Sequence, residues 1–150
     1  MKSIIACPSV LVTRSLEVTG WQEALKVLVA GMWEAMYAAT GIGLAAPQLG
    51  VNWRVVVVDV SGGVIGAPQL VLVNPVIMWA SATIEEAAEG CLSLPGIQIP
   101  IKRPIAVTVK YQDIDGEGRE LTAAGLTAKA ICHEIDHLDG ILITERARIG

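Results

Sequence analysis

The chain has 150 residues, enough for one domain with a full hydrophobic core, and we expect residues 1–150 to form that single domain. Its net charge of −4 and its lack of any basic block argue against DNA binding. Hydrophobic residues make up 53% of the chain, yet no apolar run approaches the roughly 20 residues that cross a membrane, so no membrane association is expected.

The first predicted element is a helix over residues 22–39. Its apolar residues recur at helical spacing: Leu25, Leu28, Val29, Met32 and Met36. We interpret this stripe as a core-facing surface, and Gly41 is expected to end the helix.

A loop of small and apolar residues follows at 41–50, with the sequence Gly-Ile-Gly-Leu-Ala-Ala-Pro-Gln-Leu-Gly. It is not a phosphate-binding loop, because its glycine spacing differs and no Gly-Lys-Ser/Thr follows. Gln48 is its only strongly polar side chain. That side chain either faces water or directs its amide at developing negative charge.

Several β-rich runs come next. The predicted strands are residues 54–60, 69–73, 75–79 and 105–111, with a turn at 115–116 leading to a last strand at 119–122. The valine-rich run at 54–60 is too continuously apolar to be an exposed strand. Strands that are separate from helices predict an α+β fold.

Cys91 lies between these strands, in the segment Glu-Gly-Cys-Leu-Ser-Leu-Pro. As a thiolate, cysteine is a soft ligand suited to iron or zinc. The alternative is a small buried core residue, which is common for a free cysteine. With Cys7 and Cys132 the chain has three cysteines, which do not form a disulfide framework and fit a reducing compartment.

The last predicted helix, residues 124–138, contains His-Glu-Ile-Asp-His and both of the chain's histidines. Residues four apart share a helix face, so His133 and His137 can bind one metal ion. Glu134 lies beside them and is placed to move protons for an attacking water. We expect Cys132 to pack in the core and Asp136 to be a solvated or locally bonded helix residue.

A catalytic metal site usually has three protein ligands, so His133 and His137 need a third. Ile143 stands where one metalloprotease class has a third histidine, and Glu145 is too close to serve as in a second class. The third ligand is therefore expected upstream. This requirement favours the ligand interpretation of Cys91 over the core interpretation.

Three segments together resemble, in the same order, the signature motifs of the peptide deformylase family. These motifs are Gly-x-Gly-x-Ala-Ala-x-Gln at 41–48, Glu-Gly-Cys-x-Ser at 89–93 and His-Glu-x-x-His at 133–137. The resemblance extends over nearly the whole chain. It implies short, mostly antiparallel strands around a central helix that carries the metal motif. It also implies a hydrolase that removes the formyl group from the N-terminal formylmethionine of new polypeptides and releases formate.

The resemblance also implies a role for each matched residue. The metal ligands would be Cys91, His133 and His137. Glu134 would be the general base and acid, while the Gln48 amide and the Leu92 N–H would donate to the oxyanion. Gly43 would meet the backbone of the peptide substrate. Ile42, Leu126 and Ala130 either line the pocket for the methionine side chain or belong to the core.

One divalent metal ion is the implied cofactor, with Fe(2+) expected and Zn(2+), Ni(2+) or Co(2+) also able to bind. The expected partners are a formyl-Met peptide as substrate and the ribosome as a transient contact. We expect a monomer in the cytoplasm. Glu89 and Arg103 either pair, as the matching positions do in the family, or are unrelated surface charges.

The chain departs from the family pattern at three places. Residues 8–13 match poorly the usual Pro-Asp-Pro-x-Leu-Arg. Gln98 stands where many members have an arginine that helps to hold the peptide. The family often adds a C-terminal helix or tail after the metal helix, and little sequence follows that helix here.

Two other functions compete with deformylation. A different metallohydrolase, such as a peptidase, would use the same His-Glu-x-x-His chemistry, but Gln48 and the Cys91 segment fit the deformylase pattern better. A non-catalytic binding module would be expected to have lost at least one catalytic position, whereas every matched position is intact.

Overall fold

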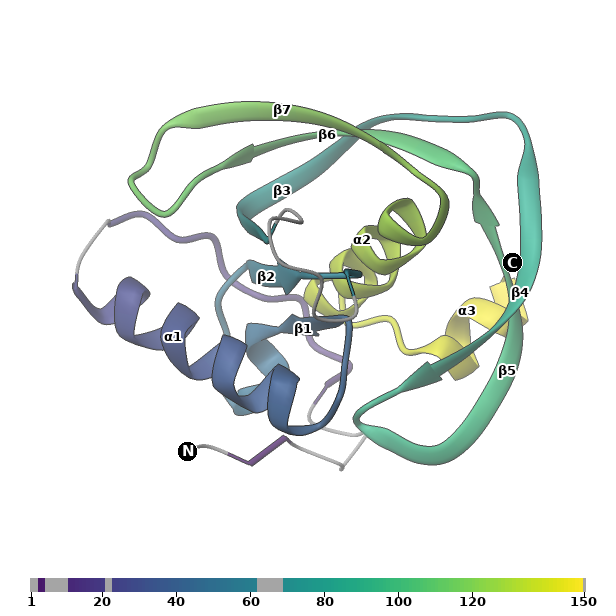
Figure 1. Ribbon diagram of the computed structural model, residues 1–150, viewed down its shortest axis with the longest axis horizontal. Helices are drawn as coiled ribbons and strands as arrows, with labels where there is room; N and C mark the ends of the chain where they lie inside the picture. The colour runs from purple at the N-terminus through teal and green to yellow at the C-terminus, as the bar shows by residue number, and fades with distance from the viewer. Residues whose placement is uncertain (1–2, 5–10, 21–22, 62–68, 150) are drawn as a thin grey trace.

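The computed structural model describes residues 3–4, 11–20, 23–61 and 69–149 (Figure 1). The helices are α1 (Glu23–Ala38), the short 3₁₀ helix η2 (Ala46–Leu49), α2 (Gly125–Leu138) and α3 (Ile143–Ile149). The strands are β1 (Gly43–Ala45), β2 (Val55–Val58), β3 (Leu70–Ala80), β4 (Ile84–Cys91), β5 (Leu94–Pro104), β6 (Ala106–Gln112) and β7 (Gly118–Ala124).

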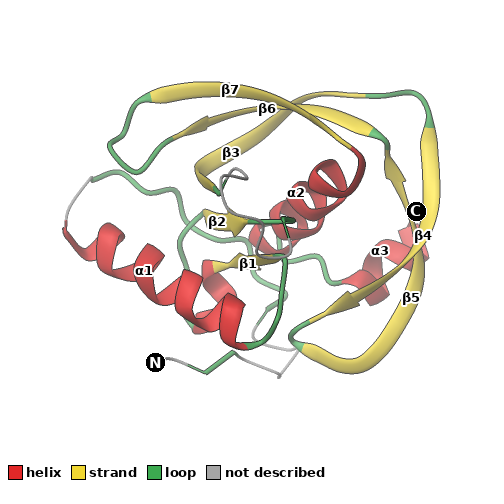
Figure 2. Cartoon of the chain, in the orientation of Figure 1, coloured by secondary structure: helices red, strands yellow, loops and turns green. Residues whose placement is uncertain are grey.

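The strands form two antiparallel sheets, as Figure 2 shows. A five-stranded sheet has the order β1-β2-β3-β6-β7, and β4 and β5 form a separate two-stranded sheet. This arrangement confirms the α+β fold with mostly antiparallel strands. Two strands are longer than the short strands expected, because β3 and β5 each have 11 residues.

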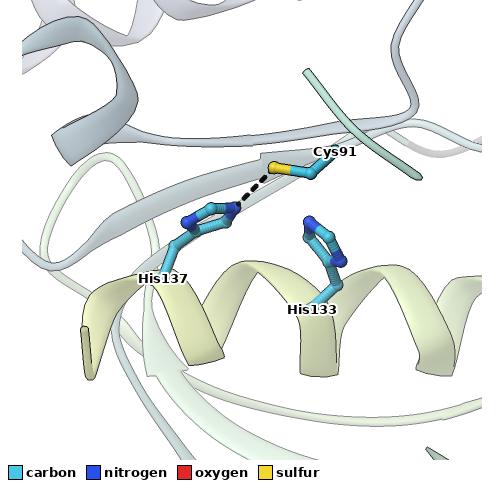
Figure 3. A group of neighbouring side chains, drawn as sticks. All are labelled: Cys91, His133 and His137. Carbon is cyan, nitrogen blue, oxygen red and sulfur yellow. Dashed lines mark hydrogen bonds between the residues drawn. The ribbon is translucent and has the colours of Figure 1, made fainter. Parts of the chain in front are cut away.

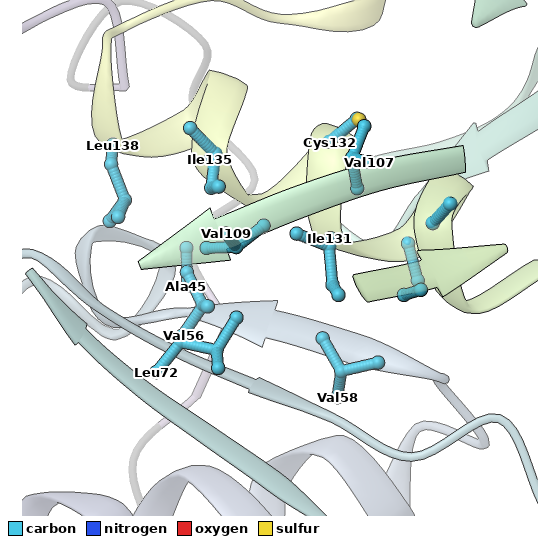
Figure 4. Close-up of a cluster of buried hydrophobic side chains, with 13 residues drawn as sticks. Ala45, Val56, Val58, Leu72, Val107, Val109, Ile131, Cys132, Ile135 and Leu138 are labelled. Carbon is cyan, nitrogen blue, oxygen red and sulfur yellow. The ribbon is translucent and has the colours of Figure 1, made fainter. Parts of the chain in front are cut away.

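The β2 strand lies between helices α1 and α2, and this position explains why it consists of four valines. Val56 and Val58 belong to the cluster that contains Ile131 and Ile135 of α2 (Figure 4). Val55 and Val57 belong to a second cluster with five apolar residues of α1: Leu25, Val29, Met32, Ala35 and Met36. Because side chains of a strand alternate between its faces, both faces of β2 are buried and the run has no polar residue.

The first helix matches its prediction closely, although residue 22 lies outside the described residues. Helix α1 ends at Ala38, and Thr40 takes the left-handed conformation, with φ of 54°. The N–H of Gly41 then donates to the carbonyl of Met36 at 2.9 Å. The left-handed residue after the helix is therefore Thr40, and the prediction that Gly41 ends the helix was wrong.

The prediction of two strands at 69–73 and 75–79 was also wrong, because β3 is continuous. Its register shifts between Val73 and Val76, and Asn74 between them has φ of 51°. The Asn74 side chain amide donates to the carbonyl of Val18 at 2.8 Å and to Gln112 at 2.9 Å. A bulge held in this way accommodates Pro75, which has no N–H for the sheet.

The sequence patterns did not predict β4, β5 or α3. Three prolines in β5 discourage a strand prediction: Pro95, Pro100 and Pro104. Proline is tolerated there because, among the strands of the described residues, β5 pairs with β4 alone. The helix α3 shows that the chain does form a helix after the metal motif, where none was expected. Residues 8–10 and Cys7, singled out in the sequence, lie outside the described residues.

In the described part of the chain, no helix is both long and apolar enough to cross a membrane.

Candidate metal centre and active site

The two histidines project from α2 toward the same point (Figure 3). His133 and His137 are one helical turn apart, and their ring centroids are separated by 5.0 Å. The helix follows β7 directly: Gly125 begins it with φ of 62°, and the Gly125 N–H donates to the carbonyl of Ile105. The start of α2 is thereby fixed against the sheet.

Cys91 reaches the histidines from the end of β4. Cys91 pairs with Leu94 across a tight turn, so its side chain is presented at the tip of the β4–β5 ribbon. Its Sγ lies 3.2 Å from Nε2 of His137, and one potential ligand atom from each of Cys91, His133 and His137 lies within 4.8 Å of the others. The tertiary structure therefore brings together the three ligands expected from the sequence.

These residues fit a divalent metal ion. A thiolate with two imidazoles is a donor set for iron(II) or zinc. Nδ1 of His133 lies 3.0 Å from Oε1 of Glu89, and such a carboxylate partner would fix the ring and leave Nε2 available to a metal. Burial, reinforced by His133 and Arg103, lowers the pKa of His137 to about 3, so its imidazole is neutral, the form that binds a metal. Burial also lowers the pKa of His133, but its contacts with Glu134, Cys91 and Glu89 outweigh burial and raise the pKa to about 10, so a metal would bind His133 in place of a proton.

Glu134 is buried beside this group with an uncommitted carboxylate. Its Oε1 makes no hydrogen bond with any other residue of the described ranges. Burial raises the pKa of Glu134 to about 7. A carboxylate of that pKa can both accept and return a proton near neutral pH, as a general base and acid must.

Gln48 is buried as well, so the alternative of a loop glutamine that faces water was wrong. Its Oε1 accepts a hydrogen bond from the Ala45 N–H at 2.9 Å, and its Nε2 donates to Oγ of Ser93 at 3.1 Å. The same Nε2 lies 3.9 Å from Sγ of Cys91. The amide is therefore held at both ends and lies next to the candidate ligand.

A cavity of about 700 Å³ opens over these residues. Its lining includes the predicted pocket residues Ile42, Gly43, Leu126 and Ala130, together with Gln48, Leu92, Cys91, His133 and Glu134. Ile42 and Leu126 are exposed, so the core alternative was wrong for these two. Ala130 is buried and lies in both environments, because it lines the cavity and also belongs to the core cluster.

Glu89 and Arg103 form the predicted pair. Arg103 donates from Nε and from one Nη to the two carboxylate oxygens of Glu89, at 2.9 and 3.0 Å. Burial alone would raise the pKa of Glu89, but its hydrogen bonds with His133 and Arg103 outweigh burial and lower the pKa to about 2. Glu89 is therefore an ionised partner for His133.

Asp136 was expected to be a solvated or locally bonded helix residue, and this prediction was wrong. It is buried, and it accepts hydrogen bonds from Arg103 at 2.6 Å and from Arg146 at 2.7 Å. The helix turns Asp136 toward β5 and α3, neither of which had been predicted. Arg146 carried no signal in the sequence, because only its helix α3 brings it to Asp136.

Cys132 packs in the core cluster on α2, as expected (Figure 4). Burial raises the pKa of its thiol to about 11, which disfavours the thiolate form that metals bind.

Comparisons with known proteins agree with this geometry. The sequence model of the family described as "Polypeptide deformylase" matches residues 1–149. The peptide deformylase 2 of Gloeobacter violaceus is 45% identical over 132 residues, which cover 88% of this chain and 71% of that relative. A peptide deformylase of Prochlorococcus marinus is 42% identical over 137 residues, covering 91% of this chain and 68% of the relative.

Solved structures are also similar. A peptide deformylase from Synechococcus elongatus in complex with actinonin has a TM-score of 0.91 and 39% identity, over 97% of this chain and 79% of that chain. The peptide deformylase from Thermotoga maritima has a TM-score of 0.87 and 39% identity, over 97% of this chain and 95% of that chain.

Proposed function

Because this chain belongs to the peptide deformylase family, we propose how its own residues remove the formyl group from the formylmethionine that begins a new polypeptide. The protein is a metal-dependent hydrolase that acts on N-formylated peptides and releases formate. One observation carries the assignment of roles: the ligand atoms of Cys91, His133 and His137 lie within 4.8 Å of one another. This group lies beside the buried carboxylate of Glu134, at the base of an open cavity.

Cys91, His133 and His137 hold the metal ion in this proposal. When bound, a divalent ion supplies Lewis acidity, which lowers the pKa of water from 15.7 toward about 7. The thiolate and the two imidazoles suit iron(II), the ion that we propose, and they also accommodate zinc, nickel or cobalt. Glu89 orients His133 through the Nδ1 contact of 3.0 Å.

Glu134 moves the proton. It removes a proton from the attacking water, whose oxygen joins the formyl carbon, and it delivers a proton to the nitrogen as the C–N bond breaks. The products are formate and a free N-terminal methionine. The raised pKa of Glu134 and the uncommitted Oε1 support this role, because the carboxylate can accept a proton without breaking another hydrogen bond.

Gln48 and Leu92 stabilise the oxygen that gains negative charge. Nε2 of Gln48 and the backbone N–H of Leu92 are the two donors. The hydrogen bond from the Ala45 N–H to Oε1 supports the role of Gln48, because it fixes the amide before the substrate arrives. Leu92 follows Cys91 in the turn of the β4–β5 ribbon, which keeps its N–H close to the metal ligand.

The substrate occupies the cavity. Ile42 and Leu126 at its mouth, and Ala130 deeper in the wall, enclose the methionine side chain. Gly43 meets the peptide backbone from the wall of the cavity that it lines. These positions place the formyl group toward Glu134.

The wider setting follows from the same proposal. Helix α2 acts as the central helix of one catalytic domain, residues 1–150, and β1, β2 and β7 pack against it. We propose a monomer that works in the cytoplasm, where a reducing environment preserves the Cys91 thiolate. Contact with the ribosome would be transient.

The decisive experiment measures formate release from a formyl-Met peptide, with protein purified anaerobically and loaded with iron(II). Wild-type protein should release formate, and Glu134→Ala should bind the ion yet lose about 10²–10⁴-fold in turnover, because only the proton carrier is removed. No release from fully metallated wild-type protein, or full activity in Glu134→Ala, would contradict the proposal.

A further inference from the structure

A continuous chain of charged contacts connects helix α3 to His133. Arg146 of α3 donates from Nε and from one Nη to the two oxygens of Asp136, at 3.0 and 2.7 Å. Arg103 donates to Asp136 at 2.6 Å and to both oxygens of Glu89. Glu89 in turn lies 3.0 Å from Nδ1 of His133. Four charged side chains thus form the connection from α3 to His133: Arg146, Asp136, Arg103 and Glu89.

The middle of this chain is buried, so its charges are weakly screened by water. The side chains of Arg103, Asp136 and Glu89 are 4%, 11% and 13% exposed. Arg103 alone cannot neutralise two buried carboxylates. Arg146, whose side chain is 29% exposed, supplies the second positive charge. The two arginines then balance the two carboxylates, so these four side chains have no net charge.

The geometry of Arg103 shows why this balance matters for Glu89. Its guanidinium divides its donors: Nε and one Nη serve Glu89, and the other Nη serves Asp136. Without Arg146, Asp136 would retain Arg103 as its one partner among these contacts. Asp136 would then attract the Arg103 guanidinium more strongly, and this attraction would compete with the bidentate pair that orients Glu89.

Helix α3 also supports the strand side of the centre. Ile143, its first residue, packs with Leu94 and Ile101 of β5, and Cys91 packs against this cluster. The same short helix therefore contacts the supports of two candidate metal ligands, Cys91 through apolar packing and His133 through the charged chain.

We propose that Arg146 is a positioning residue for the metal centre, which acts through Asp136, Arg103 and Glu89 to hold His133 in its metal-binding orientation. The inference rests on the ligand set proposed above. It extends the support of the centre beyond the residues that touch the ligands, into a helix that contains no ligand.

The test compares Arg146→Ala and Arg146→Lys with wild-type protein. Arg148→Ala is the matched control, because Arg148 lies on the same helix, is exposed and, within the described ranges, forms an ion pair with Glu145 at 3.5 Å and not with Asp136. Arg146→Ala should release its metal to a chelator about 3-fold faster, less than the roughly 10–100-fold cost of removing a direct partner of a ligand, because Asp136, Arg103 and Glu89 lie between Arg146 and His133. Its kcat should fall with KM unchanged.

Two further readouts separate positioning from general stability. The visible spectrum of the cobalt(II) form, which reports ligand geometry, should change in Arg146→Ala and recover partly in Arg146→Lys, which restores the charge but not the two-pronged contact. In an Asp136→Asn background, Arg146→Ala should add little, because the path through Asp136 is already weakened.

The outcomes are distinct. If Arg146→Ala lowers Tm but leaves the cobalt spectrum and the metal release rate as in wild type, Arg146 is merely structural and the inference fails while the proposed function stands. Equal effects of Arg146→Ala and Arg148→Ala would also overturn it. If wild-type protein binds no metal through Cys91 and His133, the proposed function fails and the inference fails with it.

Discussion

The carboxylate of Glu134 occupies the space that a side chain at position 43 would need. A Cβ atom on Gly43 would lie 2.7 Å from Oε2 of Glu134 and 3.0 Å from its Cγ. Strand β1, which contains Gly43, packs directly against α2. Glycine is required here because the strand backbone and the helix side chain meet without an intervening atom.

Gly43→Ala should therefore impair catalysis more than folding. The added methyl group displaces the Glu134 carboxylate, and misplacing a catalytic group by about 1 Å can cost on the order of 10²-fold in rate. Steady-state formate release would show a lower kcat, with the metal content unchanged.

The matched control for that prediction is Gly31→Ala. Position 31 lies within α1, and a Cβ there meets no atom within 4 Å. This variant should be fully active and slightly more stable, by about 0.5–1 kcal/mol, because alanine favours a helix over glycine. A Gly43→Ala enzyme with wild-type kcat would show that Glu134 adjusts without loss.

Cys91→Ala and Cys132→Ala should differ sharply in metal binding. Cys91 lies 3.2 Å from Nε2 of His137, whereas Cys132 belongs to the core cluster. Losing a ligand should reduce metal affinity by more than the roughly 10–100-fold that removal of an outer partner costs. Metal analysis after dialysis should find Cys91→Ala depleted and Cys132→Ala loaded. Equal depletion of both would argue against Cys91 as a ligand.

Gln48→Leu should lower kcat by about 10²–10³-fold if the amide donates to the developing oxyanion. The variant also leaves the Ala45 N–H and the Ser93 hydroxyl without their partner, so stability should fall by about 1–3 kcal/mol.

Gln48→Glu separates these two effects. Glutamate retains an oxygen that can accept from the Ala45 N–H but has no amide donor, so kcat should fall in it as well. Kinetics and thermal unfolding would be measured on both variants. An increase confined to KM would assign Gln48 to substrate positioning instead.

Gln98→Arg should strengthen binding of peptides that end in a free carboxylate. Gln98 is exposed and lines the cavity, so an arginine at this position could reach the carboxylate of a bound peptide. An exposed ion pair contributes up to about 1 kcal/mol, so KM should fall by up to about 5-fold with kcat unchanged.

Salt and a neutral variant provide the controls for that prediction. High salt should remove the gain, because it screens an exposed pair. Gln98→Leu should show no gain under either condition. A lower KM that persists in high salt would mean that the effect is not electrostatic.

Local patterns were enough to predict the parts of the site that lie close together in the chain. His133, Glu134 and His137 share one helix, and their relative placement follows from helical geometry alone. The need for a third ligand then directed attention to Cys91. The apolar spacing in α1 and the valine run of β2 likewise predicted buried elements, because burial imposes a period on the sequence.

Longer-range features did not leave such patterns. The two long strands β3 and β5 contain prolines, and only their one-sided or bulged pairing makes these residues tolerable. Asp136 looked like a surface residue, since an aspartate in a helix usually faces water. Its burial depends on two arginines that come from β5 and α3.

The sequence by itself thus determined the helix that carries the histidines, the α+β class and the chemical nature of the donor groups, because each depends on residue type and short-range spacing. The tertiary structure decided that Cys91 meets His137, that Gly43 faces Glu134, and that Arg146 reaches the charged group behind His133. These contacts join segments far apart in the chain. The packing of the sheets against α2 and α3 determines which buried charged side chains form ion pairs, such as Asp136 with Arg103 and Arg146.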